Sequence, residues 1–247
     1  MKKLVNISLV LLALSFAACK KNNTDTPPPA PIVVVPKVKT YTVSNGATLL
    51  NTVTFEYDNT GKKTKATYMD GSRYDYTYTA NTVTEEYFTL AGVPQYKYIY
   101  TLNAGGLAES YSNPATPATI GYQFFNTEKH SILETTKTNG ILTFQKYHLY
   151  DTDGNNSKDS VVQNSGTTIR TYEYYTDKVS TIDNINFGDF INGVYNKHCV
   201  KKQTSKSPLN VITTYDYSVP ELDAQSRVIK QSYTSGANTI NYTYSYY

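Results

Sequence analysis

Two short stretches decide the fold, YDYTY at residues 74–78 and YKYIY at residues 96–100. In each stretch Tyr takes every second position, and a polar or aliphatic residue stands between the rings. Successive side chains of a β-strand point to opposite faces, so this alternation predicts strands with one tyrosine face and one largely polar face. The stretch INYTYSY at residues 240–246 repeats the pattern.

The composition extends this pattern to the whole chain. Its 247 residues include 25 Tyr and 35 Thr but no Trp. Tyr and Thr favour the pleated surface of a sheet over a helix. Long Leu, Ala, Glu and Lys stretches with a helical period are missing after the first twenty residues. A helical bundle and an α/β enzyme are both disfavoured.

Turn signals recur about every 10–14 residues from Tyr41 onward, which is typical of antiparallel strands joined by hairpins. Four turns share a tighter pattern, DNTG (58–61), NAGG (103–106), DTDG (151–154) and DAQS (223–226). Asp or Asn caps the first position of such a turn, and Gly accepts positive φ at the fourth. We expect an all-β antiparallel meander of about 14–16 strands over residues 41–247, forming a curved sheet, half-barrel or barrel.

At two of these turns the sequence resembles the YD-repeat pattern, namely FEYDNTGK (55–62) and DAQSRVIK (223–230). The whole chain also resembles Gram-negative bacterial lipoprotein domains of unknown function with a porin-like or half-barrel fold. This resemblance covers residues 41–247 and implies the architecture and the cell envelope. It brings no catalytic residues with it.

The amino terminus has the layout of a secretory signal peptide over residues 1–18, with Lys2 and Lys3 before an apolar stretch. The sequence FAAC at residues 16–19 resembles a lipobox, which implies that Cys19 is acylated. Residues 19–40 then form a lipidated, Pro-rich tether, and we expect an outer-membrane lipoprotein on the periplasmic or the exposed face. The alternative is an ordinary signal peptide followed by a coincidental cysteine.

The content of charged residues, cysteine and histidine argues against nucleic-acid-binding and metal-binding proteins. Without residues 1–18, 21 Lys and Arg face 20 Asp and Glu, and no basic block suits nucleic acid. Cys199 is then the only thiol besides Cys19. The Asp151 loop lacks the Gly and Glu of a calcium loop, and His130, His148 and His198 lack metal-ligand spacing. We expect no metal and no cofactor.

An integral outer-membrane barrel is also disfavoured, because Tyr runs through the strand centres and aliphatic residues are few. We expect a noncatalytic binding or scaffolding protein. In one hypothesis the tyrosine faces bind a glycan, and in the other the same rings only fill the core. The candidate ligand-binding residues are Tyr74, Tyr76, Tyr78, Tyr96, Tyr98 and Tyr100.

Two further functions stay open, a structural accessory subunit of an outer-membrane protein complex and, with less support, a glycosidase-type enzyme. The membrane is the expected partner through the lipid anchor, together with a polysaccharide or an outer-membrane protein. The irregular segment 180–200 interrupts the strand rhythm. It is expected to be a short helix or long loop that carries function or covers a sheet end.

Overall fold

The computed structural model describes residues 35–194 and 196–247. The predictions for the signal peptide, for Cys19 and for residues 19–34 of the tether lie outside the described residues. Residues 35–247 form one compact unit. No helix within the described ranges is long and apolar enough to cross a membrane.

Almost all regular structure is β-strand. The strands are β1 Val38–Asn45, β2 Thr48–Tyr57, β3 Lys63–Tyr68, β4 Arg73–Tyr78, β5 Thr82–Phe88, β6 Pro94–Leu102, β7 Ala108–Ser112, β8 Thr119–Phe125, β9 Ser131–Thr138, β10 Ile141–Tyr150, β11 Asn156–Gln163, β12 Gly166–Val179, β13 His198–Lys206, β14 Ile212–Tyr217, β15 Glu221–Leu222, β16 Val228–Ser235 and β17 Asn238–Tyr246. A 3₁₀ turn, η1, covers Phe190–Asn192.

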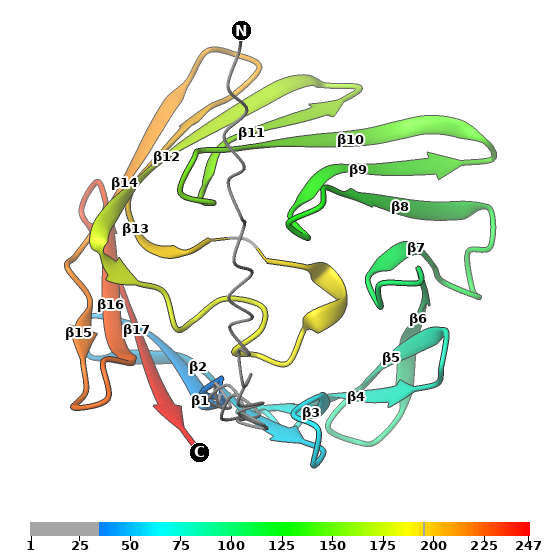
Figure 1. Ribbon diagram of the computed structural model, residues 1–247, viewed down its shortest axis with the longest axis horizontal. Helices are drawn as coiled ribbons and strands as arrows, with labels where there is room; N and C mark the ends of the chain where they lie inside the picture. Colours follow the sequence, from blue (N-terminus) through cyan, green and yellow to red (C-terminus); the bar gives the residue numbers. More distant parts are fainter. Residues whose placement is uncertain (1–34, 195) are drawn as a thin grey trace, which may run out of the picture. The chain divides into compact units, whose positions relative to one another are not determined.

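The strands close into an antiparallel barrel (Figure 1). Except at β15, each strand pairs with its neighbours in sequence, and β1 pairs with both β2 and β17, which joins the two ends of the sheet. The two-residue strand β15 only pairs with β16, which also pairs directly with β14, so sixteen strands form the wall. The all-β antiparallel prediction is confirmed, and of the predicted shapes the closed barrel is the one present.

The predicted alternation separates the inside of the barrel from the outside. Tyr76, Glu85 and Tyr98 are cross-strand neighbours on one face of β4, β5 and β6. The rings of that face point inward, because Tyr76 lies 4.4 Å from Lys63 Nζ, and Lys63 in turn contacts the segment that fills the barrel interior. The neighbouring positions Asp75 and Glu86 pair on the outer face.

The β12–β13 connection fills one end of the barrel. Its described part, residues 180–194, is called the plug here, and it lies within the ring of strands (Figure 1, yellow). Asn186 accepts a hydrogen bond from Val38 N and donates one to Pro36 O, both at 3.0 Å. Val194 N donates to Lys129 O in the β8–β9 turn at 3.1 Å. The plug therefore spans from the start of β1 to the β8–β9 turn.

The main hydrophobic core holds the plug in place. Phe187 of the plug packs against Phe55, with ring centroids 5.4 Å apart, and against Tyr41 at 6.5 Å. Phe55 belongs to a buried cluster with Val38, Val53 and Ala66. Segment 180–200 was expected to cover an open sheet end or to carry function. A closed barrel has no open edge, and the segment instead fills the barrel end from within.

The four predicted turns have the expected geometry and lie at the plugged end. Asp58 Oδ1 accepts hydrogen bonds from Thr60 N at 2.8 Å and Lys62 N at 2.9 Å, while Gly61 has φ 79°. The same side-chain bonds recur in the turns that begin at Asn103, Asp151 and Asp223. Backbone donors left over at each hairpin are thus satisfied within the turn.

Replacing Gly106 by Ala is expected to lower the free energy of unfolding by about 1 kcal/mol, because Gly106 has φ 77° and L side chains avoid this region. No heavy atom lies within 4 Å of the added Cβ, so the loss reports backbone strain alone. Urea unfolding measures it. Gly106→Asn is the matched control and should lose less, because Asn tolerates this conformation. Equal losses in the two variants would contradict the assignment.

Candidate functional site

The end of the barrel opposite the plug has eight strand connections, all of them short, and the longest, residues 113–118, has six residues. Barrels of sixteen strands are wider than inward-facing side chains alone fill, and connections of this length are too short to cross the barrel end. The two ends are called the plugged end and the open end below. The site consists of the inward-facing side chains between them.

All six tyrosines predicted to bind a ligand point into this interior, from β4 and β6. Tyr87 of β5 lies between the two strands, and its ring centroid is 5.0 Å from those of both Tyr74 and Tyr96. Tyr111 of β7 continues the row beside Tyr98 and Tyr100. The tyrosine wall is this set, Tyr74, Tyr76, Tyr78, Tyr87, Tyr96, Tyr98, Tyr100 and Tyr111. Sequence reasoning missed Tyr87 and Tyr111, because neither has a second Tyr two positions away.

The hydrogen-bond partners of the tyrosine hydroxyls change along the barrel axis. Near the plugged end Tyr78 Oη donates to Lys63 O at 2.9 Å, so the Tyr78 side chain helps to hold β4 against the start of β3. The Tyr74 and Tyr96 hydroxyls, nearer the open end, bond to each other. The hydroxyls of Tyr98 and Tyr100 have no hydrogen-bond partner among the described residues. The mid-barrel rings are half-buried, and their remaining exposed area faces the interior.

Across the barrel, β9–β12 present charged side chains, and we call this group the charged wall: Glu134, Lys146, His148, Asp159 and Tyr172. His148 Nε2 lies 2.9 Å from Glu134 Oε1, and Nδ1 lies 2.8 Å from Asp159 Oδ1. Tyr172 Oη donates to Asp159 Oδ2 at 2.9 Å. Lys146 Nζ completes the group, 3.6 Å from Glu134 and 3.9 Å from Asp159.

The charged wall favours the imidazolium form of His148. Burial lowers the pKa of His148, but the hydrogen bonds with Asp159 and Glu134 outweigh burial and raise it above its ordinary value. Burial also raises the pKa of Asp159, but bonds from His148 and Asn156 outweigh it and lower that pKa to about 2. Both ring nitrogens are engaged, so His148 has no free lone pair to act as a general base.

Sequence reasoning missed the charged wall. Glu134, Lys146 and Asp159 come from three different strands, and only the strand register makes them neighbours. No local spacing marks such a group. Within the described ranges, no set of three His, Cys, Asp or Glu side chains is arranged to hold a metal ion.

A buried ion pair fixes the plug below the tyrosine wall. Lys63 Nζ lies 2.5 Å from Asp189 of the plug, and the Lys63 side chain is only 7% exposed. Burial raises the pKa of nearby Glu85, although Lys63 opposes that effect. The pair offsets the cost of placing Lys63 inside the barrel.

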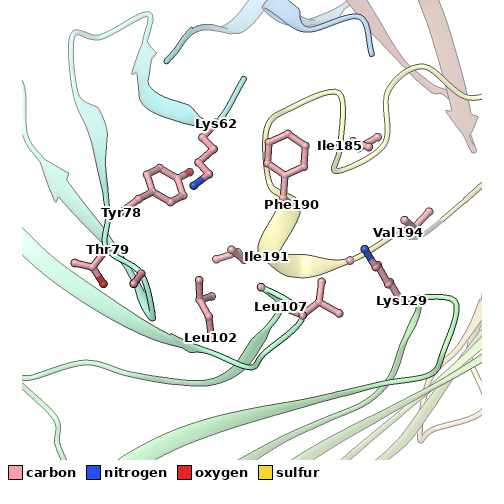
Figure 2. A pocket seen from close by; sticks show the side chains of 14 residues that line it. Lys62, Tyr78, Thr79, Leu102, Leu107, Lys129, Ile185, Phe190, Ile191 and Val194 are labelled. Carbon is pink, nitrogen blue, oxygen red and sulfur yellow. The ribbon is translucent and has the colours of Figure 1, made fainter. Parts of the chain in front are cut away.

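Between the plug and the surrounding turns lies a cavity of about 380 Å³ (Figure 2). Phe190 and Ile191 of the plug face Leu102 and Tyr78 across it. Tyr78 therefore belongs to this mainly apolar cavity, whereas the rings nearer the open end face the barrel interior beyond it. Lys62 projects from the β2–β3 turn, with Nζ 5.2 Å from the Tyr78 ring centroid.

Comparison with solved structures shows the same kind of barrel elsewhere. The crystal structure of a porin-like protein from Bacteroides uniformis is similar over 85% of this chain and 98% of that chain, with a TM-score of 0.64 and 13% sequence identity. A Photorhabdus luminescens Tc holotoxin pore matches 81% of this chain and 10% of that chain, with a TM-score of 0.32 and 14% identity. The chain matches no protein-family model and no curated protein sequence. The first likeness shows the fold.

Replacing His148 by Gln should reduce stability most at mildly acidic pH. The raised pKa of His148 means that its contribution is complete below about pH 6.5 and is lost as the pH rises through the folded-state pKa. The lowered pKa of Asp159 keeps its own contribution intact down to about pH 4. We expect a difference of about 2–4 kcal/mol in unfolding free energy between pH 4 and 6.5, shrinking at higher pH.

Urea unfolding of the wild type and the His148→Gln variant across pH 4–9 measures this difference. A constant difference over the whole range would show that His148 does not act as a charged group.

Proposed function

We propose that this protein is a noncatalytic, membrane-anchored binding protein whose barrel interior takes up a glycan chain. The observation that carries the proposal is the tyrosine wall facing the charged wall inside a barrel that is plugged at one end. Aromatic ring faces pack on the C–H faces of sugar rings, and charged and amide groups bond their hydroxyls. A ligand that enters at the open end meets the tyrosine rings and, on the charged wall, the partly exposed Glu134 and Lys146. His148 and Asp159 of that wall are buried.

The geometry of the charged wall favours binding over catalysis. The two carboxylates that a glycosidase would need, Glu134 and Asp159, are both committed to the same imidazolium. In a glycosidase, one of the two carboxyl groups carries the proton for the leaving group. Asp159, with its pKa lowered to about 2, is ionised at neutral pH.

Anchoring at the outer membrane is the second part of the proposal. The lipobox-like FAAC sequence supports acylation of Cys19, and the fold shared with a porin-like protein fits an envelope location. Two or more acyl chains are enough for stable attachment to a bilayer.

A structural accessory role is the alternative function, and the outer wall of the barrel provides one observation in its favour. Phe124, Ile132, Tyr147 and Leu149 are 40–57% exposed on the neighbouring strands β8, β9 and β10. Exposed apolar groups of this kind are common at protein interfaces. An accessory subunit would bind a membrane protein there and no glycan.

The glycan proposal predicts that Tyr98→Ala, in the middle of the tyrosine wall, weakens binding about 10-fold through loss of one stacked ring. A glycan array identifies the ligand, and calorimetry compares the variants. Tyr98→Phe should bind nearly as well as the wild type, because it keeps the ring. Tyr147→Ala on the outer wall is the control and should change nothing. A protein that binds no glycan on the array but co-purifies with a membrane protein would establish the accessory role instead.

The anchor proposal predicts that Cys19→Ser lowers the share of the protein found in the membrane fraction. Mass spectrometry of the wild-type amino terminus should find an acylated Cys19. Protease treatment of intact cells then separates the two faces of the membrane, since a periplasmic barrel stays protected. An unmodified Cys19 would refute lipid anchoring without affecting the glycan proposal.

A further inference from the structure

The open end of the barrel has very few charged residues in its strand connections. Its eight connections are residues 46–47, 69–72, 89–93, 113–118, 139–140, 164–165, 207–211 and 236–237. We call these connections, with the adjoining strand ends, the open rim. The strand ends add Arg73, which pairs with Asp75, and the exposed Lys206. Asp70 is the one charged residue in the eight connections. Its carboxylate already accepts bonds from Ser72 N and Oγ, at 2.9 and 2.6 Å.

The connections at the plugged end differ sharply in charge. They carry Asp58, Lys62, Glu128, Lys129, Asp151, Asp153, Asp183, Asp189, Lys197, Glu221, Asp223 and Arg227. Both ends are built from hairpins of the same sheet and need the same turn chemistry. Hairpin geometry therefore does not require the connections of the open rim to be poor in charge.

Large apolar side chains take the place of charges on the open rim. They are Leu49, Leu50, Met69, Leu90, Val93, Ile141, Leu142, Leu209, Val211 and Ile212, each 43–85% exposed. The most exposed are Leu209 at 85%, Leu90 at 75% and Ile141 at 69%. Single exposed apolar residues are ordinary on a protein surface, but their concentration at one end is not.

The placement of these apolar residues around the rim indicates the shape of the partner that would bind there. They come from the β1–β2, β3–β4, β5–β6, β9–β10 and β13–β14 connections, which are spread around the barrel wall (Figure 1). A small ligand or a single peptide segment would touch only one part of such a ring. A broad, flat surface would reach all five connections together.

We propose that the open rim seats on a lipid bilayer, with its apolar side chains inserted at the boundary between head groups and acyl chains. Binding of this kind grows with the apolar area buried and is opposed by charges in the contact. The open rim has exposed leucines, isoleucines and valines, and its few charged groups are Asp70, which is already bonded, Arg73, which pairs with Asp75, and Lys206. The barrel mouth then faces lipid head groups, and the charged plugged end faces water. This proposal rests on observations separate from those for glycan binding and for Cys19 acylation, and a seated rim restricts entry at the mouth to ligands at the membrane surface.

The absence of Trp from the sequence allows a direct test. In the full chain, Leu209→Trp and Leu90→Trp each place a single reporter on the open rim. Val219→Trp is the matched control at the plugged end, where Val219 is 56% exposed. Each variant is mixed with neutral phosphatidylcholine vesicles whose acyl chains carry bromine, which quenches Trp only on contact. Circular dichroism checks that each variant keeps the β-sheet spectrum.

The two rim reporters should lose at least half of their fluorescence and shift to shorter wavelength, while the Val219→Trp reporter stays unchanged. Because an acylated Cys19 anchors all three variants equally, it does not produce this difference. Equal quenching at both ends, or no quenching at the rim, would overturn the proposal. So would a rim reporter that shifts without lipid as the protein dimerises, since the rim would then bind a second copy.

Discussion

The antiparallel pairing of β1 with β17 is the constraint on which the rest of the structure depends. It runs from Val38 opposite Tyr246 to Asn45 opposite Ile240 and joins the first strand to the last. Without it the sheet would keep two open edges, and exposed edges invite pairing with other chains. Closure also creates an inside, and only with an inside do the tyrosine faces become a shared wall.

Closure leaves a wide interior that side chains fill unevenly. At one end the plug brings Phe187 onto the buried cluster around Phe55, and the Lys63–Asp189 pair sits beside it. Tyrosine rings line one side of the interior, and Glu134, Lys146, His148 and Asp159 lie across the barrel from them. The rings supply apolar area, and the charged groups are satisfied by one another instead of by water. Core and candidate binding surface are thus successive levels of one barrel.

Much of the fold could be predicted from the sequence, because the relevant signals are local. The period of two in YDYTY and YKYIY sets which residues face inward, and Asp58 with Gly61 determines a turn that the structure confirms. The choice between a half-barrel and a closed barrel depends on strands some 200 residues apart, and no short-range pattern records it. The hypothesis that the tyrosine rings only fill the core and the hypothesis that they bind a ligand both rest on the same alternation of Tyr along the strands.

Of the two walls of the candidate site, only the tyrosine wall could be predicted from the sequence. Tyr74 to Tyr100 could be named because each ring has a partner two positions away in the chain. His148, Glu134 and Asp159 could not, since their contacts arise from the register of β9, β10 and β11. The partners of the plug were also hidden. Asn186 bonds to Pro36 and Val38, about 150 residues earlier, through backbone groups that carry no sequence signal.

The position of Lys37 gives the plug a mechanical role. Lys37 Nζ donates to Ile185 O at 2.6 Å, and Asn186 bonds to the residues on either side of Lys37. Val38 also forms the first ladder pair of β1, with Tyr246, and Lys37 O accepts a hydrogen bond from Tyr247 N at 3.2 Å. Tension applied to the chain before Val35 is therefore shared between the plug inside the barrel and the seam that closes its wall.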